Sequence, residues 1–203
     1  TQRAQKLGAD GALLLTPYYN KPTQEGLYQH FSTVAKETDL PIMLYNVPSR
    51  TAVNMEPGTV ERLSAIKNII GIKEASGSLV QVSEIIESCG PDFLLISGED
   101  ALTWPILAIG GKGAISVTAN LVPDKCASLC KAAREGDIET AKALHYELLK
   151  LNDIMFIETN PIPVKAALAL MGRIENEFRA PLCAPSEEHL SQLTTVLKDY
   201  SLL

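Results

Sequence analysis

The feature that most constrains this chain is the alternation of short apolar runs with amphipathic segments. Five runs are predicted strands: residues 11–16, 41–46, 69–73, 93–97 and 114–117. Their hydrophobicity is nearly continuous, which is typical of strands covered on both faces in a parallel sheet. The segments between them repeat apolar residues at helical spacing. The pattern therefore predicts an α/β fold built from successive βα units.

Local signals place the helices. Thr23 is a candidate N-cap for a helix whose apolar face carries Leu27 and Phe31. Gly90 and the proline after it end a helix that begins near Leu79. A shorter helix is expected around 102–109. After the fifth strand the pattern predicts only helices, near 123–134, 137–155, 162–171 and 186–199.

Two architectures fit this order of elements. On strand count alone, an open doubly wound sheet of five strands is favoured over part of an eight-stranded barrel. However, the chain begins inside a helix, since Ala4 and Leu7 share a face and Gly8 then ends it. Such a helix resembles the end of a unit whose strand is absent. Three further units of about 30 residues each would complete a barrel.

Composition excludes several functional classes. The chain has 46% hydrophobic residues and a net charge of -6, with no run rich in Lys or Arg, so nucleic-acid binding is not expected. No segment approaches the ~20 apolar residues of a membrane span, and the first residues do not form a secretory signal. Four cysteines suit a reducing compartment. We therefore expect a soluble, cytoplasmic protein. Cys126 and Cys130 lack a third metal ligand nearby, so no metal site is expected.

Lys73 closes the apolar run 69–72 and is the first candidate for chemistry. Most lysines lie on the solvated surface, and that interpretation stays open. A lysine at the carboxyl end of a buried strand instead extends into a cleft, where parallel sheets hold their active sites. Dry surroundings would favour a neutral amine that attacks a carbonyl carbon.

Tyr45 ends the preceding strand, and neighbouring strands lie about 4.8 Å apart, so the side chains of Tyr45 and Lys73 should approach each other. A phenol there could carry protons, although an ordinary tyrosine at a sheet edge is the alternative.

The loops that follow these strands add two further candidates. Arg50 could bind a carboxylate through its planar guanidinium, or it could be a solvated loop residue. The segment 16–22 (TPYYNKP) holds two prolines and the adjacent Tyr18 and Tyr19, a pattern that indicates a contact surface.

Together, segments 16–22 (TPYYNKP), 45–51 (YNVPSRT) and 71–75 (GIKEA) resemble the dihydrodipicolinate synthase family. This family consists of pyruvate-dependent class I aldolases built on a (β/α)8 barrel. The resemblance covers the whole chain. It implies a lyase that condenses pyruvate with L-aspartate 4-semialdehyde to give 4-hydroxy-tetrahydrodipicolinate, in lysine and diaminopimelate biosynthesis. It also implies no separate cofactor and a homotetramer assembled from two dimers.

The resemblance implies catalytic roles for three residues. Lys73 matches the lysine that forms a Schiff base with pyruvate. Tyr45 matches the tyrosine that passes protons during imine formation. Tyr19 matches the member of the proton relay that reaches into the active site of a neighbouring subunit.

Binding roles follow for four more residues. Arg50 matches the arginine that binds the carboxylate of aspartate semialdehyde. Gly98 and Ile115 match positions whose backbone lines the pyruvate pocket. Tyr18 matches a contact for the feedback inhibitor lysine in bacterial members.

One departure from the family pattern bears on the fold. The first three βα units of the family, with their Gly-Thr-Thr-Gly-Glu loop, have no counterpart in this sequence. We therefore expect residues 1–122 to be the C-terminal part of the barrel, roughly strands four to eight. Residues 123–203 are expected to form a helical extension packed on that barrel.

Two other functions remain in view. An N-acetylneuraminate lyase-like or keto-deoxy-sugar aldolase would share Lys73 and Tyr45, but Arg50 argues against it because the sugar lyases we compare lack an arginine there. An inactive fragment is the other alternative, since the threonines of the missing loop would complete the relay.

Overall fold

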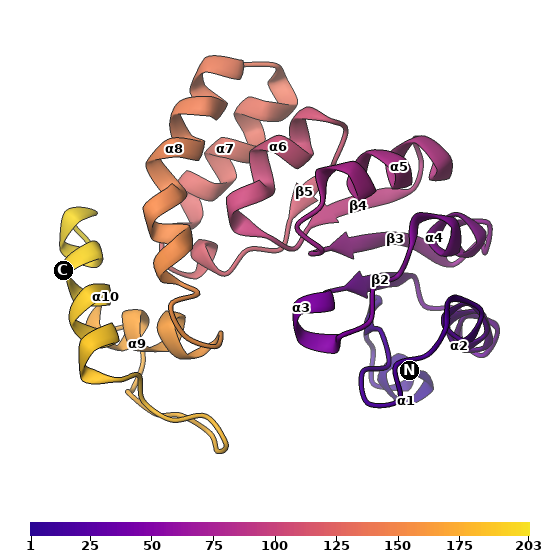
Figure 1. The fold of residues 1–203 in the computed structure, drawn as a ribbon, viewed down its shortest axis with the longest axis horizontal. Coiled ribbons are helices and arrows are strands. Elements are labelled where there is room, and N and C mark those ends of the chain that lie inside the picture. Colours follow the sequence, from indigo (N-terminus) through magenta and orange to yellow (C-terminus); the bar gives the residue numbers. More distant parts are fainter. The chain divides into compact units, whose positions relative to one another are not determined.

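Residues 1–115 contain a five-stranded parallel sheet, with its strands in the sequential order β1-β2-β3-β4-β5. The computed structural model describes all 203 residues, and residues 116–203 form a second compact unit (Figure 1). The strands are β1 (Ala12–Leu15), β2 (Ile42–Asn46), β3 (Ile69–Glu74), β4 (Leu94–Ser97) and β5 (Gly113–Ala114). All four strand pairs are parallel, which confirms the predicted α/β fold.

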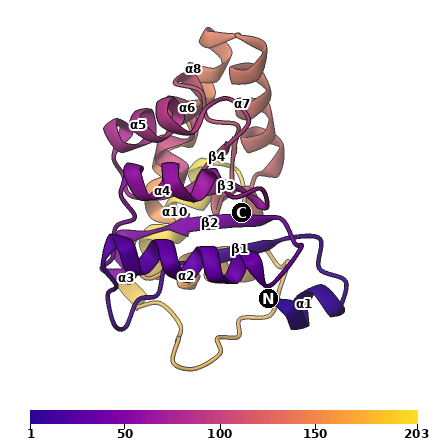
Figure 2. The ribbon, with the colours of Figure 1, turned by 90° about the vertical axis from the view of Figure 1, so that its right-hand side faces the viewer.

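Three of the connecting helices lie along one side of this sheet (Figures 1 and 2). They are α2 (Gln24–Lys36), α4 (Pro57–Ser64) and α5 (Leu79–Cys89). The shorter elements of this unit are α1 (Gln2–Lys6), α3 (Pro48–Thr51), η1 (Asp100–Leu102) and α6 (Thr103–Ala108). Thr23 caps α2 as predicted, because its Oγ1 accepts a hydrogen bond from the Gly26 N–H at 3.2 Å. Helices α3 and α4 were not predicted; each begins with a proline at its first position, where proline is favoured.

The helix-covered face of the sheet carries the hydrophobic core. Phe31 of α2, Leu44 of β2, Ile72 of β3 and Ile85 of α5 are fully buried in one cluster. Burial of such a side chain contributes about 1.5–3 kcal/mol.

The other face of the sheet is partly open. Leu13, Leu15 and Ile70 are 47%, 38% and 36% exposed. The expectation of strands covered on both faces is therefore wrong for the residues of this chain. Continuous apolar runs conceal the alternation that the structure shows, because both faces carry aliphatic side chains.

An irregularity in the β2–β3 ladder sets the register of the sheet. Ile42 pairs with Ile69, but the next residue, Met43, pairs with Gly71. The shift places Tyr45 opposite Lys73. Gly71 itself lies against β4, where an added Cβ would stand 2.2 Å from the Leu94 carbonyl oxygen. Only glycine fits this close approach of two strands.

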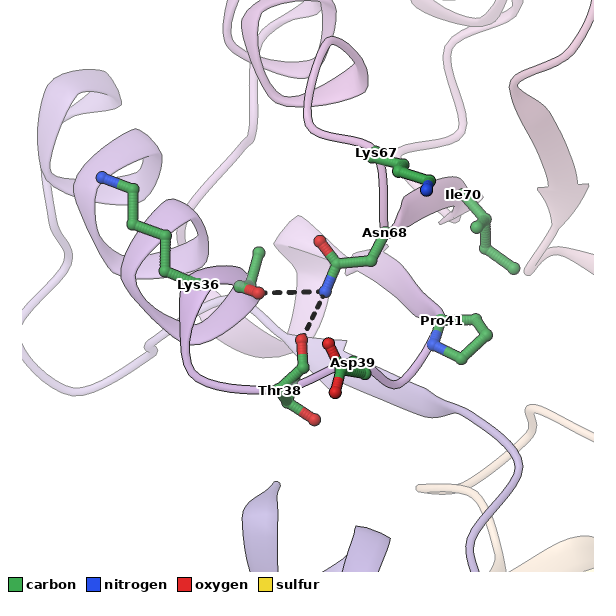
Figure 3. A pocket seen from close by; sticks show the side chains of 8 residues that line it. Lys36, Thr38, Asp39, Pro41, Lys67, Asn68 and Ile70 are labelled. Atoms are coloured by element: carbon green, nitrogen blue, oxygen red, sulfur yellow. Dashed lines mark hydrogen bonds between the residues drawn. The ribbon is translucent and has the colours of Figure 1, made fainter.

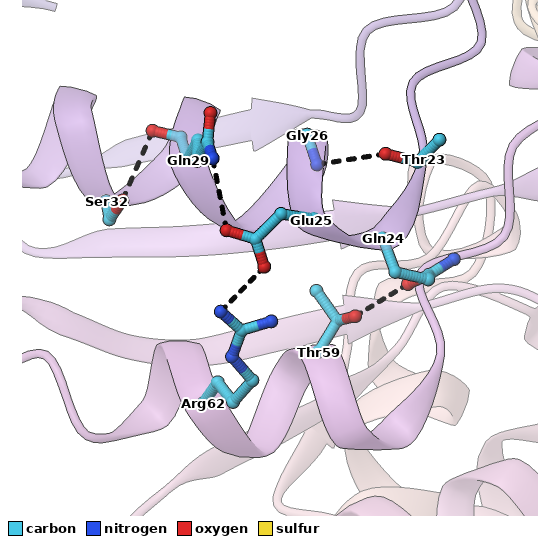
Figure 4. A network of polar contacts seen from close by, with 8 residues as sticks. All are labelled: Thr23, Gln24, Glu25, Gly26, Gln29, Ser32, Thr59 and Arg62. Atoms are coloured by element: carbon cyan, nitrogen blue, oxygen red, sulfur yellow. Dashed lines mark hydrogen bonds and ion pairs between the residues drawn. The ribbon is translucent and has the colours of Figure 1, made fainter.

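Polar contacts join α2 to α4 on the outside of the molecule (Figure 4). The Arg62 guanidinium lies 2.9 Å from the Glu25 carboxylate and holds the pKa of that carboxyl below its usual value. Thr59 Oγ1 donates to Gln24 Oε1 at 2.7 Å. These contacts fix the spacing of two helices that cover neighbouring strands.

The second unit is helical, as the sequence predicts. It contains η2 (Thr118–Asn120), α7 (Pro123–Glu135), α8 (Ile138–Ile154), α9 (Ile162–Leu170) and α10 (Glu187–Asp199). Ser186 Oγ caps α10 by accepting from the His189 N–H at 3.2 Å. The predicted fifth strand is shorter than 114–117, because Ser116 Oγ accepts from the Ala119 N–H at 2.9 Å and the chain turns into η2. Among all the helices, none combines the length and the apolar character that crossing a bilayer requires.

Candidate active site

Lys73 and Tyr45 form the centre of the candidate site. They are paired residues near the carboxyl ends of β3 and β2, and Lys73 Nζ lies 4.2 Å from the centroid of the Tyr45 ring. The amine of Lys73 therefore lies over the face of the Tyr45 ring. Both side chains are half-buried, so the fully dry surroundings expected for Lys73 are not present in this chain.

Gly98 and Ile115 extend the same edge of the sheet across β4 and β5. The Gly98 N–H donates to the Glu74 carbonyl at 2.8 Å, and the Ile115 N–H donates to the Ser97 carbonyl at 2.9 Å. A Cβ added to Gly98 would stand 2.9 Å from Lys73 Cε and 3.2 Å from Lys73 Cγ. The absence of a side chain at position 98 therefore leaves the space that the Lys73 side chain occupies.

The remaining candidates follow the carboxyl ends of β1 and β2. Arg50 lies in α3, directly after β2, and is exposed. Tyr18 and Tyr19 follow β1 and are 63% and 93% exposed. The chain thus places all three at the expected edge of the sheet, but Tyr19 is too exposed to contact the Lys73–Tyr45 pair within this chain.

A buried polar network behind this pair was missed by the sequence analysis. The Glu74 carboxylate accepts from Asn46 Nδ2 at 3.0 Å, from Gln81 Nε2 at 3.2 Å and from the Ser76 N–H at 2.6 Å. Asn46 and Glu74 are 0% and 1% exposed. The signal for this network was the polar residue directly after each candidate, Asn46 after Tyr45 and Glu74 after Lys73.

A pocket at the opposite end of the strands has a different character (Figure 3). It is lined by Ile70 at the start of β3 and by residues that precede β2 and β3, among them Lys36, Asp39 and Lys67. On one side of the pocket, Asn68 Nδ2 donates to the backbone carbonyls of Ala35 at 3.0 Å and Thr38 at 2.9 Å. These bonds hold the turns together at the amino ends of the strands, away from Lys73.

The residues of this chain include no group of three or more His, Cys, Asp or Glu side chains that could hold a metal ion. Burial raises the pKa of the Cys130 thiol. A raised thiol pKa disfavours the thiolate that metal binding requires.

Lys73 thus lies at the carboxyl edge of a parallel sheet, where α/β enzymes hold their active sites, and a lysine amine there can bind a carbonyl substrate as an imine. A sequence model of the Dihydrodipicolinate synthetase family matches residues 1–200, and the chain belongs to this family.

Individual relatives agree with this assignment. The 4-hydroxy-tetrahydrodipicolinate synthase of Thermodesulfovibrio yellowstonii is 56% identical over 203 residues, which are 100% of this chain and 70% of the relative. The crystal structure of dihydrodipicolinate synthase from Thermotoga maritima superposes with a TM-score of 0.97 at 48% identity, covering 100% of this chain and 70% of the other. The dihydrodipicolinate synthase of Acinetobacter baumannii, solved in complex with pyruvate, gives a TM-score of 0.97 at 44% identity, with the same coverage.

Proposed function

We propose that this protein is a lyase that condenses pyruvate with L-aspartate 4-semialdehyde to give 4-hydroxy-tetrahydrodipicolinate, in lysine and diaminopimelate biosynthesis. Family membership and the 56% identity to a 4-hydroxy-tetrahydrodipicolinate synthase support this activity. The single observation that carries the mechanism is the position of Lys73 Nζ, 4.2 Å from the centroid of the Tyr45 ring.

The proposed reaction passes through an imine on Lys73. The neutral amine attacks the keto carbon of pyruvate, and loss of water gives the imine. Loss of a proton from the methyl group gives an enamine, whose carbon attacks the aldehyde of the second substrate. The amino group of that substrate then displaces Lys73 from the imine carbon and closes the ring. Because the lysine supplies the covalent bond, this chemistry needs no separate cofactor.

Proton transfer and binding are assigned to the other candidates. Tyr45 moves protons during imine formation, since general acid–base catalysis requires a group beside the reacting nitrogen. Tyr19 acts in the relay of a neighbouring subunit, which agrees with its exposure of 93% in this chain. Arg50 binds the carboxylate of aspartate semialdehyde as a charge-assisted contact.

Three further positions have proposed binding roles. The backbone at Gly98 and Ile115 lines the pyruvate pocket, and both lie at the carboxyl edge where Lys73 stands. Tyr18 contacts the feedback inhibitor lysine, and its exposure of 63% leaves its ring accessible.

We further propose that residues 1–122 correspond to strands four to eight of a (β/α)8 barrel and that residues 123–203 are its helical extension. The partly exposed apolar face at Leu13, Leu15 and Ile70 supports this, because the inner face of a barrel carries such side chains. The proposed assembly is a homotetramer, which light scattering on the purified protein would test; a single monomeric species would contradict it. A cytoplasmic location stays a prediction that agrees with four free cysteines.

Trapping of the imine tests the proposed function. Borohydride added in the presence of pyruvate should attach one reduced pyruvate to the peptide that contains Lys73. The variant Lys73→Arg should give no adduct and lose at least about 10³-fold in turnover, as expected when a nucleophile is removed. The matched variant Lys67→Arg should behave as the unmodified protein. Absence of an adduct on the unmodified protein, or cleavage of sialic acid in place of semialdehyde condensation, would reject the proposal.

A further inference from the structure

A row of buried polar side chains lies directly behind the candidate catalytic pair. Successive residues of a strand point to opposite faces of the sheet, so Asn46 and Glu74 point away from the side on which Tyr45 and Lys73 meet. Asn46 pairs with Glu74 across the β2–β3 ladder, one position beyond Tyr45 and Lys73. Glu74 pairs in turn with Ser97 of β4, which is 0% exposed. The face that holds the hydrophobic core therefore changes to polar residues at the level of the site.

The groups that contact the end of the Glu74 side chain all donate hydrogen bonds, so a carboxylate fits this position and an amide does not. The Met55 N–H donates to Asn46 Oδ1 at 2.9 Å, which turns Asn46 Nδ2 toward Glu74. Gln81 Nε2 donates to Glu74 Oε2, and the Ser76 N–H donates to Oε1. Both carboxylate oxygens thus accept from neutral donors, and the hydrogen bonds replace the water that this side chain loses on burial. An amide in place of the carboxylate would set one of its own N–H groups against a donor.

The same network reaches the segments on both sides of the site. Asn46 Nδ2 also donates to Asn54 Oδ1 at 2.9 Å, and Asn54 Nδ2 donates to Gln81 Oε1 at 2.8 Å. Asn54 follows the short helix that carries Arg50, and Gln81 lies in the first turn of α5. One buried carboxylate therefore connects β2, β3, the segment after Arg50 and the helix after Lys73.

We infer that Glu74 is a positioning residue for the imine-forming reaction. It holds the ends of β2 and β3 in the register that places Lys73 Nζ over the Tyr45 ring, and it acts through Asn46 and the backbone of Lys73. This inference rests on the proposed function for its kinetic consequences and on the hydrogen-bond geometry for its structural ones.

The test compares Glu74→Gln with Glu84→Gln in the intact protein. Glu84 is an exposed residue of α5, so its variant controls for loss of the charge alone. Glu74→Gln should slow imine formation with pyruvate by about 10- to 100-fold, because displacement of a reacting group by about 1 Å costs up to this factor. The KM for pyruvate should change by less than about threefold, since binding contacts are kept. Glu84→Gln should leave both constants unchanged.

Rescue separates positioning from a general loss of stability. The double variant Glu74→Gln with Asn46→Asp moves the carboxylate to the neighbouring strand and sets a donor opposite it. The Asn54 and Gln81 amides, which now bond to positions 46 and 74, match this exchange once both turn over, so that Asn54 donates to position 46 and Gln81 accepts from position 74. The double variant should recover most of the lost rate even if its melting temperature stays low. A rate loss in Glu74→Gln that equals the unfolded fraction, or an unchanged rate in the folded variant, would overturn the inference.

If Glu74→Gln does not fold, Gln81→Met removes one donor to Glu74. It should slow imine formation by about three- to tenfold, and an unchanged rate there would overturn the inference as well.

A measurement that needs no pyruvate keeps this inference distinct from the proposed function. The acetylation rate of Lys73 relative to Lys67, followed by peptide mass, reports how the amine is held. Glu74→Gln should change this ratio severalfold, and Glu84→Gln should not. If the unmodified protein forms no imine, the proposed function fails while this ratio still tests the positioning. An unchanged ratio in Glu74→Gln would overturn the positioning itself.

Discussion

The amine of Lys73 lies over the ring of Tyr45, 4.2 Å from its centroid, because the two residues are direct partners in the β2–β3 ladder. The contact is therefore a property of the sheet register and not of loop conformation. A site built on paired strands is held more precisely than one built on loops. Substitutions that disturb this pairing should affect chemistry before they affect substrate binding.

The first prediction concerns Gly98. Alanine at this position would place a Cβ 2.9 Å from Lys73 Cε and 2.9 Å from Ala75 Cβ, so the lysine side chain must move. We expect imine formation with pyruvate to slow by about 10- to 100-fold. Rapid-quench borohydride trapping measures this rate.

Gly58→Ala is the matched control for that experiment. Its added Cβ meets no atom within 4 Å, and the residue lies in α4. The control should keep the full rate and gain up to about 1 kcal/mol in the free energy of unfolding. An unchanged trapping rate in Gly98→Ala would show that the Lys73 side chain can move away from the added methyl group without loss of reactivity.

The second prediction separates the ring of Tyr45 from its hydroxyl. Tyr45→Phe keeps an aromatic face under Lys73 but removes the proton-carrying group, so kcat should fall by about 10²- to 10⁴-fold while the protein stays folded. Tyr146→Phe changes a tyrosine that is 62% exposed in α8 and should have no effect. Measurement of steady-state turnover in both variants tests this prediction. Full activity of Tyr45→Phe would show that the Tyr45 hydroxyl takes no part in the reaction.

The third prediction concerns the exposed Arg50 of α3. Loss of a hydrogen-bonded cation should raise the KM for aspartate semialdehyde by about 10- to 100-fold, because bonds to charged groups contribute about 1.5–3 kcal/mol. Arg50→Ala should still form the pyruvate imine at the normal rate. Arg3→Ala, in α1, is the control and should change neither constant. An equal fall in imine trapping would mean that Arg50 supports the fold of the site instead of the second substrate.

The fourth prediction concerns the pH dependence of the second unit. Glu158 accepts from the Ser186 N–H at 2.9 Å and contacts His189 Nδ1 at 2.7 Å, and these contacts hold the pKa of its carboxyl below the usual value of 4.5. A lowered pKa in the folded state means that the contribution to stability is complete above the usual value. The contribution is lost as the pH falls through the lowered value. Glu158→Gln should therefore lower the melting temperature at neutral pH and flatten its decline in acid.

Melting temperatures recorded from neutral pH to about pH 3 test this expectation. Glu175→Gln, at an exposed position, is the control and should keep the acid decline of the unmodified protein. If Glu158→Gln declines as steeply as this control, other carboxyl groups cause the acid sensitivity.

The sequence was sufficient for the parts of the fold that depend on local patterns. The five strands, the Thr23 cap and the nearness of Lys73 to Tyr45 follow from apolar runs, a capping residue and strand ends. Helix α4 was missed because its first turn contains Pro57 and Gly58, which signal a turn when no structure is at hand.

The Glu74 network was missed for a different reason. A glutamate after a lysine is normally assigned to solvent, and its burial depends on Asn46 and Gln81, which come from separate segments of the chain. The shift between Ile42 and Met43 is equally invisible to pattern analysis, because Ile69, Ile70 and Ile72 are all apolar.

That shift has a consequence for insertions and deletions in β3. Ile69 and Ile72 both belong to the hydrophobic core although they are an odd number of positions apart, so the irregularity reverses the inside–outside order of the strand. Loss of Ile70 would give a regular ladder and leave the amine where it is. One residue gained after Gly71 would instead turn the Lys73 amine toward the helix-covered face, beside the buried Asn46, and the Glu74 carboxylate toward the substrate. Length variation in related sequences is therefore expected before Gly71 and excluded after it.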